Sequence, residues 1–361
     1  MSSKGRSSDE RMLSDERVGE PVGMTAVLIA GLGDVGVRTA RQLLDTPGID
    51  RVLVAARDLR AAREVASALQ DGAEPVEWSP PDAVPEGVRV IASAVPGEHD
   101  VALARAAIAA GVSYACSADH DVALRGLLAL DVDARAAGTN VVIGCGMAPG
   151  LSDVLARHAC GAFDSVDELH VARWGVAGDA SISAARRALR EPAREWRDGL
   201  VVHDRHRGPE LVWFPDPVGA RECELVATGV ELLASSAPGA RRVTARLGVP
   251  ATGRFFPAGR FTPPGRRDPG AAWGAVRVEA WGGQGATRAS IVYGVIERTA
   301  VAAGTVLGVV AAGLAGALPT IVAEAAPGAC GLGTMVKPVP FLAELSRRGV
   351  KAATFEGVAV A

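Results

Sequence analysis

The chain has 361 residues, enough for two domains that each bury a hydrophobic core. Its formal net charge of −3 excludes the strongly basic character of nucleic-acid-binding proteins, so we expect no nucleic-acid partner. The five cysteines are scattered without CxxC spacing, so we expect neither disulfides nor a metal site, and a cytoplasmic protein.

The N-terminal stretch differs in composition from the rest of the chain. Residues 1–23 are rich in Ser, Glu, Asp and Arg and contain no apolar run. A signal peptide needs an apolar segment, so this composition argues against one. It predicts a disordered tail.

A strand, a glycine-rich turn and a helix follow the tail. Residues 26–30 are continuously apolar, which predicts a buried parallel strand. The motif GLGDVG occupies residues 31–36, and helical apolar spacing resumes after it. This context predicts a dinucleotide-binding turn, in which the N-terminus of the helix faces the phosphates.

Each residue of the turn has an expected role in holding the cofactor. Gly31 permits the tight turn, Gly33 lets backbone N–H groups approach a pyrophosphate, and Gly36 lets the helix pack closely on the sheet. Asp34 and Val35 provide the first N–H groups of the helix and are also expected to contact the cofactor.

The end of the second strand bears on the choice between NAD and NADP. An NAD-preferring protein usually has an acidic residue there, which binds the ribose hydroxyls. Here Ala55 and Ala56 are followed by Arg57, whose guanidinium suits the 2′-phosphate of NADP. We therefore predict NADPH as the cofactor, with Arg57 as its phosphate ligand. The alternative is that Arg57 is a solvated surface residue and Asp58 binds the ribose.

Strands and helices alternate up to residue 150, which predicts a doubly wound parallel sheet, a Rossmann domain over residues 24–150. Apolar runs and helical spacing predict strands at 52–56, 76–78, 88–94, 112–119 (with its exit turn) and 140–143, and helices at 59–69, 98–110 and 122–137.

The pattern changes beyond residue 160 and predicts a second, α+β domain over residues 151–298 with a mixed or antiparallel sheet. Alternation over 168–176 places Leu169, Val171 and Arg173 on one face of a strand. Further strands are predicted at 200–202, 211–214, 276–281 and 288–295, and an arginine-bearing helix at 182–190.

Residues 299–323 contain no charged side chain, which meets the length criterion for a membrane span. The run is mostly Ala, Gly and Val, is interrupted by Pro319 and has no flanking basic cluster. We therefore predict a buried helix of a soluble protein with no membrane partner. It opens a C-terminal helical segment over residues 299–361.

Several motifs together resemble the saccharopine dehydrogenase-like NAD(P) oxidoreductases. They are GLGDVG, VSY at residues 112–114 with its strand exit, and GCGMAPGLSDVLA at residues 144–156. Residues 297–304 and 341–350 resemble the C-terminal segments of that family. The likeness weakens between residues 161 and 274, where such enzymes bind substrate.

The resemblance implies that the C-terminal segment packs back on the Rossmann domain, and that a substrate sits between the domains. It implies NADPH-dependent hydride transfer to an imine or related bond of a small metabolite bearing an amine or a carboxylate. We also expect a homodimer. By position, the residues expected at the nicotinamide end are Ser93, Ala94, Val95, Pro96, Cys116, Ser117, Met147 and Pro149.

Imine reduction also needs a proton donor within hydrogen-bond reach. We name Asp119 and His120, at a strand exit, as the catalytic candidates; Tyr114 and Cys145 are further possible donors. A helix-capping Asp and a solvated His remain the alternative. Arginines that could bind substrate carboxylates are Arg173, Arg186, Arg187 and Arg190.

Two other functions remain open from the sequence. One is an NADPH-binding redox sensor without turnover. The other is a reductase of an activated C=C bond or a ketone.

Overall fold

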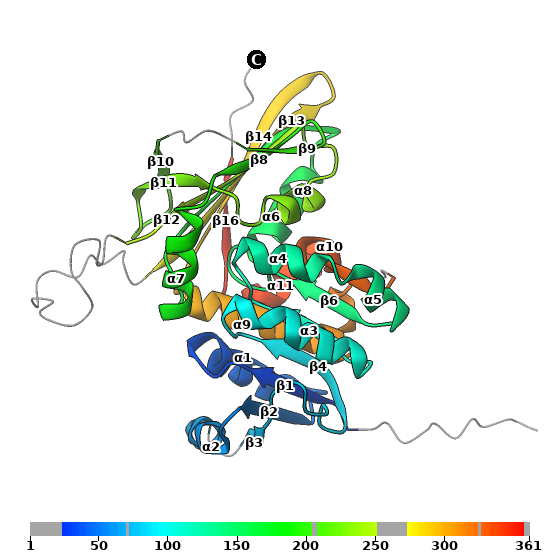
Figure 1. Cartoon of the computed structure of the whole chain (residues 1–361). Helices are drawn as coiled ribbons and strands as arrows, with labels where there is room; N and C mark the ends of the chain where they lie inside the picture. Colours follow the sequence, from blue (N-terminus) through cyan, green and yellow to red (C-terminus); the bar gives the residue numbers. More distant parts are fainter. Residues whose placement is uncertain (1–23, 70–71, 204–207, 251–272, 324–325, 357–361) are drawn as a thin grey trace, which may run out of the picture.

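The computed structural model describes residues 24–69, 72–203, 208–250, 273–323 and 326–356. The predicted tail, residues 1–23, lies outside this range. Two sheets dominate the described chain, and Figure 1 shows the first sheet with its helices in the lower half of the view and the second sheet above it.

The first sheet is parallel throughout, with the strand order β15-β6-β5-β4-β1-β2-β3. Without β15 this is the doubly wound order of a dinucleotide-binding domain. Its strands are β1 (Ala26–Ala30), β2 (Arg51–Ala56), β3 (Glu74–Glu77), β4 (Val88–Ser93), β5 (Ser113–Cys116), β6 (Asn140–Ile143) and β15 (Gly328–Gly331).

Helices cover both faces of this sheet, so its central strands are apolar on both sides. All five residues of β1 are buried. The helix predicted at 122–137 consists of two helices separated by a short break. The helices are α1 (Asp34–Leu44), α2 (Leu59–Ala68), η1 (Gly97–His99), α3 (Asp100–Ala109), α4 (Asp121–Leu128) and α5 (Asp131–Ala136).

The second sheet is mixed, as predicted. Its main path is β10-β11-β12-β7-β13-β14-β16, with β8 and β9 added beside β12. Among the described strands of this second sheet, only the pair β12 and β7 is parallel. The strands are β7 (Ser165–Trp174), β8 (Arg194–Arg197), β9 (Leu200–His203), β10 (Glu210–Trp213), β11 (Ala220–Val226), β12 (Arg242–Gly248), β13 (Gly274–Gln284), β14 (Thr287–Glu297) and β16 (Ala352–Glu356).

One face of the second sheet packs on helices, and the other carries polar side chains together with an apolar cluster around Trp174, Phe214 and Cys223. Leu169 and Val171 of β7 are buried on the inner face, where α6 (Leu151–Cys160) packs against β7 and β13. The helix α8 (Val230–Ser236) lies beside α6, and α7 (Asp179–Ala188) follows β7. The alternation of β7 therefore directs Arg173 inward, toward the first domain.

The helix α9 (Thr299–Leu314) is buried on nearly all sides and packs on α1. It ends nine residues before the predicted end at residue 323. Among the described residues, no helix combines the length and the hydropathy needed to cross a membrane. The close fit to α1 depends on two glycines of α9: a Cβ on Gly304 would lie 2.5 Å from Cβ of Arg38, and one on Gly308 would lie 2.7 Å from Cβ of Gln42.

The segment after α9 contains strands as well as helices. The strand β15 joins the first sheet beside β6, and β16 joins the second sheet beside β14. The remaining elements are η3 (Pro319–Ile321), α10 (Leu332–Met335) and α11 (Pro338–Arg347). This segment therefore returns to the first domain and also continues into the second.

We predict that Gly304→Ala lowers the free energy of unfolding by about 1–3 kcal/mol, because the added Cβ forces α1 and α9 apart. Chemical denaturation measures the change. Gly208→Ala is the control, since a Cβ there meets nothing within 4 Å. Equal stability of the two variants would contradict this account of the α1–α9 contact.

Candidate active site

The glycine turn between β1 and α1 has the geometry expected of a phosphate-binding loop. Gly31 has φ +91°, and a Cβ on it would lie 2.6 Å from the carbonyl carbon of Ala94. A Cβ on Gly36 would lie 1.8 Å from the carbonyl oxygen of Gly31. A Cβ on Gly33, by contrast, meets nothing within 4 Å, so open space lies beside the start of α1. No side chain caps that end of α1.

The tight turn and the close helix are both sterically enforced, and the open side of the loop is where its N–H groups can receive a pyrophosphate. The loop therefore fits the phosphate portion of NAD or NADP.

Backbone hydrogen bonds join the carboxyl ends of neighbouring strands into one edge. The expected nicotinamide-side segments are thereby brought together, next to the glycine turn. The bonds run from Ala94 N to Ala30 O (2.8 Å), from Ser117 N to Ser93 O (3.0 Å) and from Cys145 N to Cys116 O (2.7 Å).

The predicted cofactor residues differ in accessibility. Those with solvent-accessible surface are Gly31, Gly33, Asp34, Val35, Arg57, Ala94, Val95, Pro96 and Ser117. Those that the structure buries are Gly36, Ser93, Cys116, Met147 and Pro149. Ser93 and Cys116 are both 0% exposed, so their side chains lie in the protein interior beneath the carboxyl ends of β4 and β5 and do not face a ligand.

Arg57 and Asp58 are both exposed at the end of β2. The side chain of Asp58 accepts a hydrogen bond from the backbone N–H of Arg60 (2.9 Å) and so caps α2. The cap engages Oδ1 of Asp58.

The two catalytic candidates point to different neighbours. Asp119 Oδ2 lies 3.5 Å from Nη1 of Arg173, and the same Nη1 donates a 2.8 Å hydrogen bond to the carbonyl of Ala148. Both side chains are partly buried. Arg173 of the second domain therefore reaches across to the strand exit of β5 and to the turn that precedes α6.

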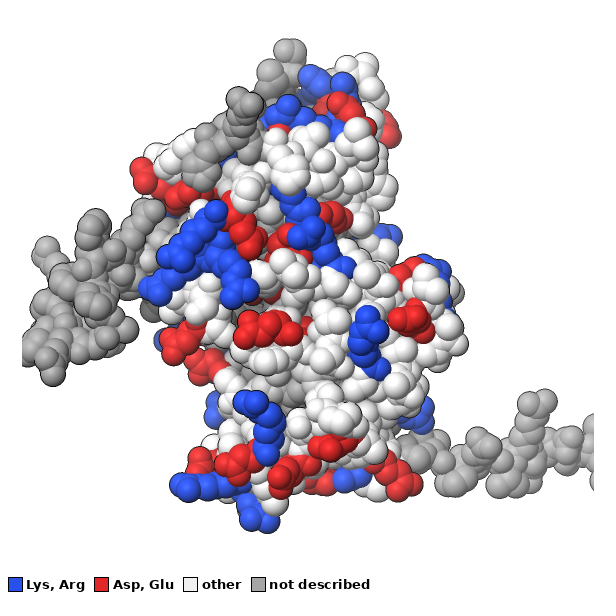
Figure 2. All heavy atoms as spheres, viewed as in Figure 1, with Lys and Arg blue, Asp and Glu red and all other residues white. Residues whose placement is uncertain are grey.

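His120 faces the region of α7. Its Nε2 lies 3.4 Å from Nη1 of Arg187 and 3.7 Å from Oε1 of Glu191. Figure 2 shows that basic side chains gather over α7 on this face of the molecule. Arg186, Arg187 and Arg190 are all exposed.

A buried carboxyl group, that of Asp100, lies under the edge formed by the carboxyl ends of the parallel strands. Asp100, at the start of α3, is 0% exposed and accepts hydrogen bonds from Oγ of Ser93 (2.7 Å) and from the hydroxyl of Tyr114 (2.5 Å). Burial raises the pKa of Asp100 to about 7, although the two hydrogen bonds oppose the shift. Tyr114 is fully buried with its proton directed at Asp100, so it does not face a substrate.

The cysteines of this region have the character of core residues. Cys116 and Cys145 are fully buried, and burial raises the pKa of both thiols well above their usual value. All five cysteines are unpaired. In the described part of the chain no group of three or more His, Cys, Asp and Glu side chains could hold a metal ion.

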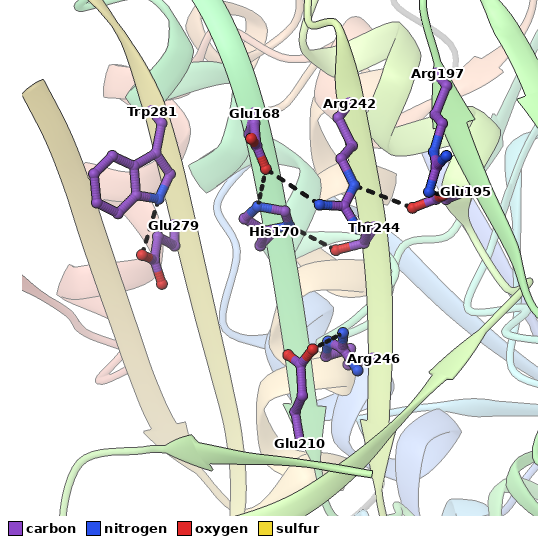
Figure 3. Close-up of polar contacts among 10 residues, drawn as sticks. All are labelled: Glu168, His170, Glu195, Arg197, Glu210, Arg242, Thr244, Arg246, Glu279 and Trp281. Atoms are coloured by element: carbon purple, nitrogen blue, oxygen red, sulfur yellow. Dashed lines mark hydrogen bonds and ion pairs between the residues drawn. The ribbon is translucent and has the colours of Figure 1, made fainter. Parts of the chain in front are cut away.

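The outer face of the second sheet carries a separate polar network (Figure 3). His170 of β7 contacts Oε2 of Glu168 (2.9 Å) and Oγ1 of Thr244 (2.8 Å). Arg242 reaches both Glu168 and Glu195. This face points away from α6, so it lies outside the candidate site.

The strand order, the glycine turn and the second sheet define a two-domain protein with a dinucleotide-binding fold. No protein-family model matches the chain, and no curated protein matches it in sequence. Solved structures do match. Saccharopine dehydrogenase (L-Glu forming) from Saccharomyces cerevisiae aligns with a TM-score of 0.65 and 15% identity over 92% of this chain and 100% of that one.

The chain therefore has the saccharopine dehydrogenase fold, which confirms the resemblance at the level of structure. Two more distant matches are a probable dehydrogenase from Thermotoga maritima and GenD2 from gentamicin A biosynthesis in complex with NAD. The first has a TM-score of 0.49 and 11% identity over 91% of this chain and 98% of that chain. The second has a TM-score of 0.46 and 15% identity over 93% of this chain and 97% of that chain.

We predict that Asp100 makes stability depend on pH. Its pKa in the folded protein is about 7 and its ordinary value is 3.8, so the folded state keeps a proton that the unfolded chain has released. Between about pH 4 and pH 7 this group therefore makes the free energy of unfolding fall as pH rises. Asp100→Asn, which keeps an oxygen for Ser93 and Tyr114, should flatten that slope in denaturation curves recorded across the window. An unchanged slope would contradict the prediction.

Proposed function

We propose that this protein is an NADPH-dependent oxidoreductase that reduces an imine, or a closely related C=N bond, of a small metabolite bearing an amine or a carboxylate. The observation that carries the proposal is the contact of Arg173 with Asp119 and Ala148, in a domain that also has a sterically enforced phosphate-binding turn. It supports a site in which a cationic side chain of the second domain and a carboxyl group of the first domain meet next to the expected nicotinamide position.

NADPH is the proposed cofactor, because Arg57 is exposed at the end of β2 while Asp58 is engaged as a helix cap. The glycine turn and the N-terminus of α1 would hold the pyrophosphate, and Arg57 the 2′-phosphate. When bound, the cofactor supplies the hydride.

We assign the proton to Asp119 in preference to His120. Asp119 lies at the exit of β5, beside Arg173, whereas His120 is directed to Arg187 and Glu191. Asp119 would pass a proton to the nitrogen of the reduced bond. Arg173 orients that carboxyl group, and the exposed arginines of α7 favour the approach of anionic substrates.

Arg57→Ala should weaken NADPH binding by about ten- to a hundredfold and leave NADH binding unchanged, because one charge-assisted contact to the 2′-phosphate is lost. Fluorescence titration with each nucleotide measures the two dissociation constants. Arg60→Ala is the matched control, since Arg60 is also an exposed arginine at this end of the domain and pairs with Glu64. A constant NADPH-to-NADH ratio would remove Arg57 as the phosphate ligand.

Asp119→Asn should lower kcat by about a hundredfold or more, while the dissociation constant of NADPH stays the same. The assay follows NADPH oxidation with a panel of amine and keto-acid pairs. His120→Gln is the comparison variant and should have the smaller effect. Equal losses in kcat and in NADPH binding would give Asp119 a structural role. Tight NADPH binding without oxidation by any pair would favour the redox-sensor function, and turnover of ketones alone would favour the ketoreductase function.

A homodimer in the cytoplasm completes the proposal. The outer face of the second sheet supports it, because Leu211 and Trp213 of β10 are largely exposed beside a face that carries both acidic and basic side chains. Light scattering should give twice the chain mass of 36.9 kDa. Trp213→Glu should shift the protein toward the monomer, and a monomeric wild-type protein would exclude the dimer.

A further inference from the structure

The outer face of the second sheet holds a cavity to which the proposed function gives no ligand. Its volume is about 330 Å³, within the range of about 300–1,000 Å³ that is typical of pockets for small molecules. Strands β7, β12 and β13 form its floor, and residues 210–213 of β10 form its wall. Ala172 of the floor directly precedes Arg173 on β7, so the two side chains point to opposite faces of the sheet. The cavity is therefore separate from the candidate active site.

The pairing of β11 accounts for the wall of the cavity. Residues 224–226 of β11 pair with β12, whereas residues 220–223 pair with β10. Among the described strands β10 therefore pairs with β11 and not with the strands of the floor. Glu210 reaches from β10 to Arg246 of β12, with 2.5 Å between Oε1 and Nη2 (Figure 3).

The side chains of β10 alternate in direction. Glu210 contacts the floor, and Val212 packs against the apolar cluster that includes Ala172. Leu211 and Trp213 alternate with them and are largely exposed. A ligand in the cavity therefore has an apolar surface at Ala172 and Val212, and it leaves Leu211 and Trp213 for contacts with a partner chain.

Two arginines flank a small side chain on the floor. Arg246 of β12 and Arg277 of β13 are both paired with Ala172 of β7, so the three residues form one row across the sheet. The backbones of the two arginines are about 10 Å apart, which is two strand spacings. Because Ala172 has only a methyl group, no side chain of this row fills the space between the two arginines.

The two carboxylates that line the cavity differ in how firmly they are held. Oε2 of Glu279 accepts from Nε and Nη2 of Arg277 (3.3 and 2.7 Å), and Oε1 of Glu279 accepts from Nε1 of Trp281 (2.9 Å). Glu210 is 61% exposed, so water competes for its ion pair with Arg246. Arg277 is 29% exposed, and its Nη1 has no partner among the described residues. An anion can therefore replace Glu210 at Arg246 and accept from Arg277 at the same time.

The other polar side chains of the lining are engaged at other rows of the floor. Arg242 donates to Glu195 (3.1 Å) and to Glu168 (3.5 Å). Both ring nitrogens of His170 are in contact, one with Glu168 (2.9 Å) and one with Thr244 (2.8 Å). These contacts leave the row described above to its two arginines.

We propose that this cavity binds a small organic acid with one carboxylate group. The carboxylate lies over Ala172 between Arg246 and Arg277, and the apolar remainder of the ligand lies against Val212. The inference concerns a second ligand site and does not depend on the proposed reaction.

The charges of the row favour a single negative charge. With Glu210 displaced to solvent, the guanidinium groups of Arg246 and Arg277 face one carboxylate, that of Glu279, so a monocarboxylate makes the group neutral. A phosphate monoester carries between one and two negative charges and is repelled more strongly by Glu279. An amine adds a positive charge beside two guanidinium groups, and a neutral amide forms weaker hydrogen bonds with them than a carboxylate does.

Isothermal titration calorimetry of the full chain tests the site without NADPH or turnover, so a failure of the proposed function does not affect it. The probes are hexanoate, cyclohexanecarboxylate and benzoate, each compared with the amide of the same carbon skeleton, and phenyl phosphate is compared with benzoate. We expect at least one carboxylate to bind at least tenfold more tightly than its amide, and benzoate to bind more tightly than phenyl phosphate. Equal binding of every acid and its amide, or no binding of any acid, overturns the inference. Tighter binding of phenyl phosphate overturns the assignment of a single charge.

Loss of one arginine tests where the carboxylate binds. Arg277→Gln should weaken binding of the tightest carboxylate tenfold or more, because one charge-assisted contact is lost. Arg288→Gln is the matched control: Arg288 is an exposed arginine of the neighbouring strand β14, pairs with Asp167 (2.6 Å) and lies outside the cavity. The control should keep the affinity within twofold, and thermal melts verify that both variants are folded. Equal affinities of the two variants overturn the assignment.

Loss of the competing carboxylate should have the opposite effect. Glu210→Gln should tighten binding threefold or more, because the ligand no longer displaces an ion pair from Arg246. Glu222→Gln is the control, since Glu222 of β11 is exposed and does not line the cavity. It should keep the affinity within twofold. Unchanged or weaker binding in Glu210→Gln, or the same gain in both variants, overturns the proposed position of the carboxylate.

Discussion

The close approach of α1 to the turn after β1 is the constraint on which the rest of the structure depends. A Cβ on Gly36 would lie 1.8 Å from the carbonyl oxygen of Gly31, so no other residue fits there while α1 keeps its position. That position directs the N-terminus of α1 at the open side of Gly33. It also places another side of α1 against α9, where Gly304 and Gly308 allow a second close contact.

Because α1 packs on α9, the position of α1 also affects how the second domain is placed. The chain that leaves α9 contributes β15 to the first sheet and β16 to the second, so the C-terminal segment ties the two domains together. Asp121 of α4 adds a buried ion pair with Arg194 of β8, whose guanidinium also binds Glu231 of α8. Removing one partner of such a buried ion pair lowers the free energy of unfolding, because the other charge is left buried and unpaired. These contacts therefore fix the position of α4 relative to β8 and α8.

Several parts of the site could be predicted because they depend on neighbours in the sequence. The glycine spacing is one of them, since the tight turn and the close helix are local requirements. The alternation of β7 is another: it places Arg173 on the same face as the buried Leu169 and Val171, and the structure directs that face toward the first domain. The fold class was predictable for the same reason. The end of α9 at Leu314 could not be predicted, because the apolar run of the sequence continues beyond the helix.

By itself the sequence determined the dinucleotide turn, the fold class of a doubly wound parallel sheet and the presence of a second, mixed sheet, because apolar periodicity and glycine spacing act over a few residues. Only the tertiary structure decided which polar groups meet. It buried Ser93 and Cys116 beneath the strand ends, and it brought Arg173 to Asp119 across 54 positions of sequence. Such meetings depend on how two domains pack, and no local pattern encodes that packing.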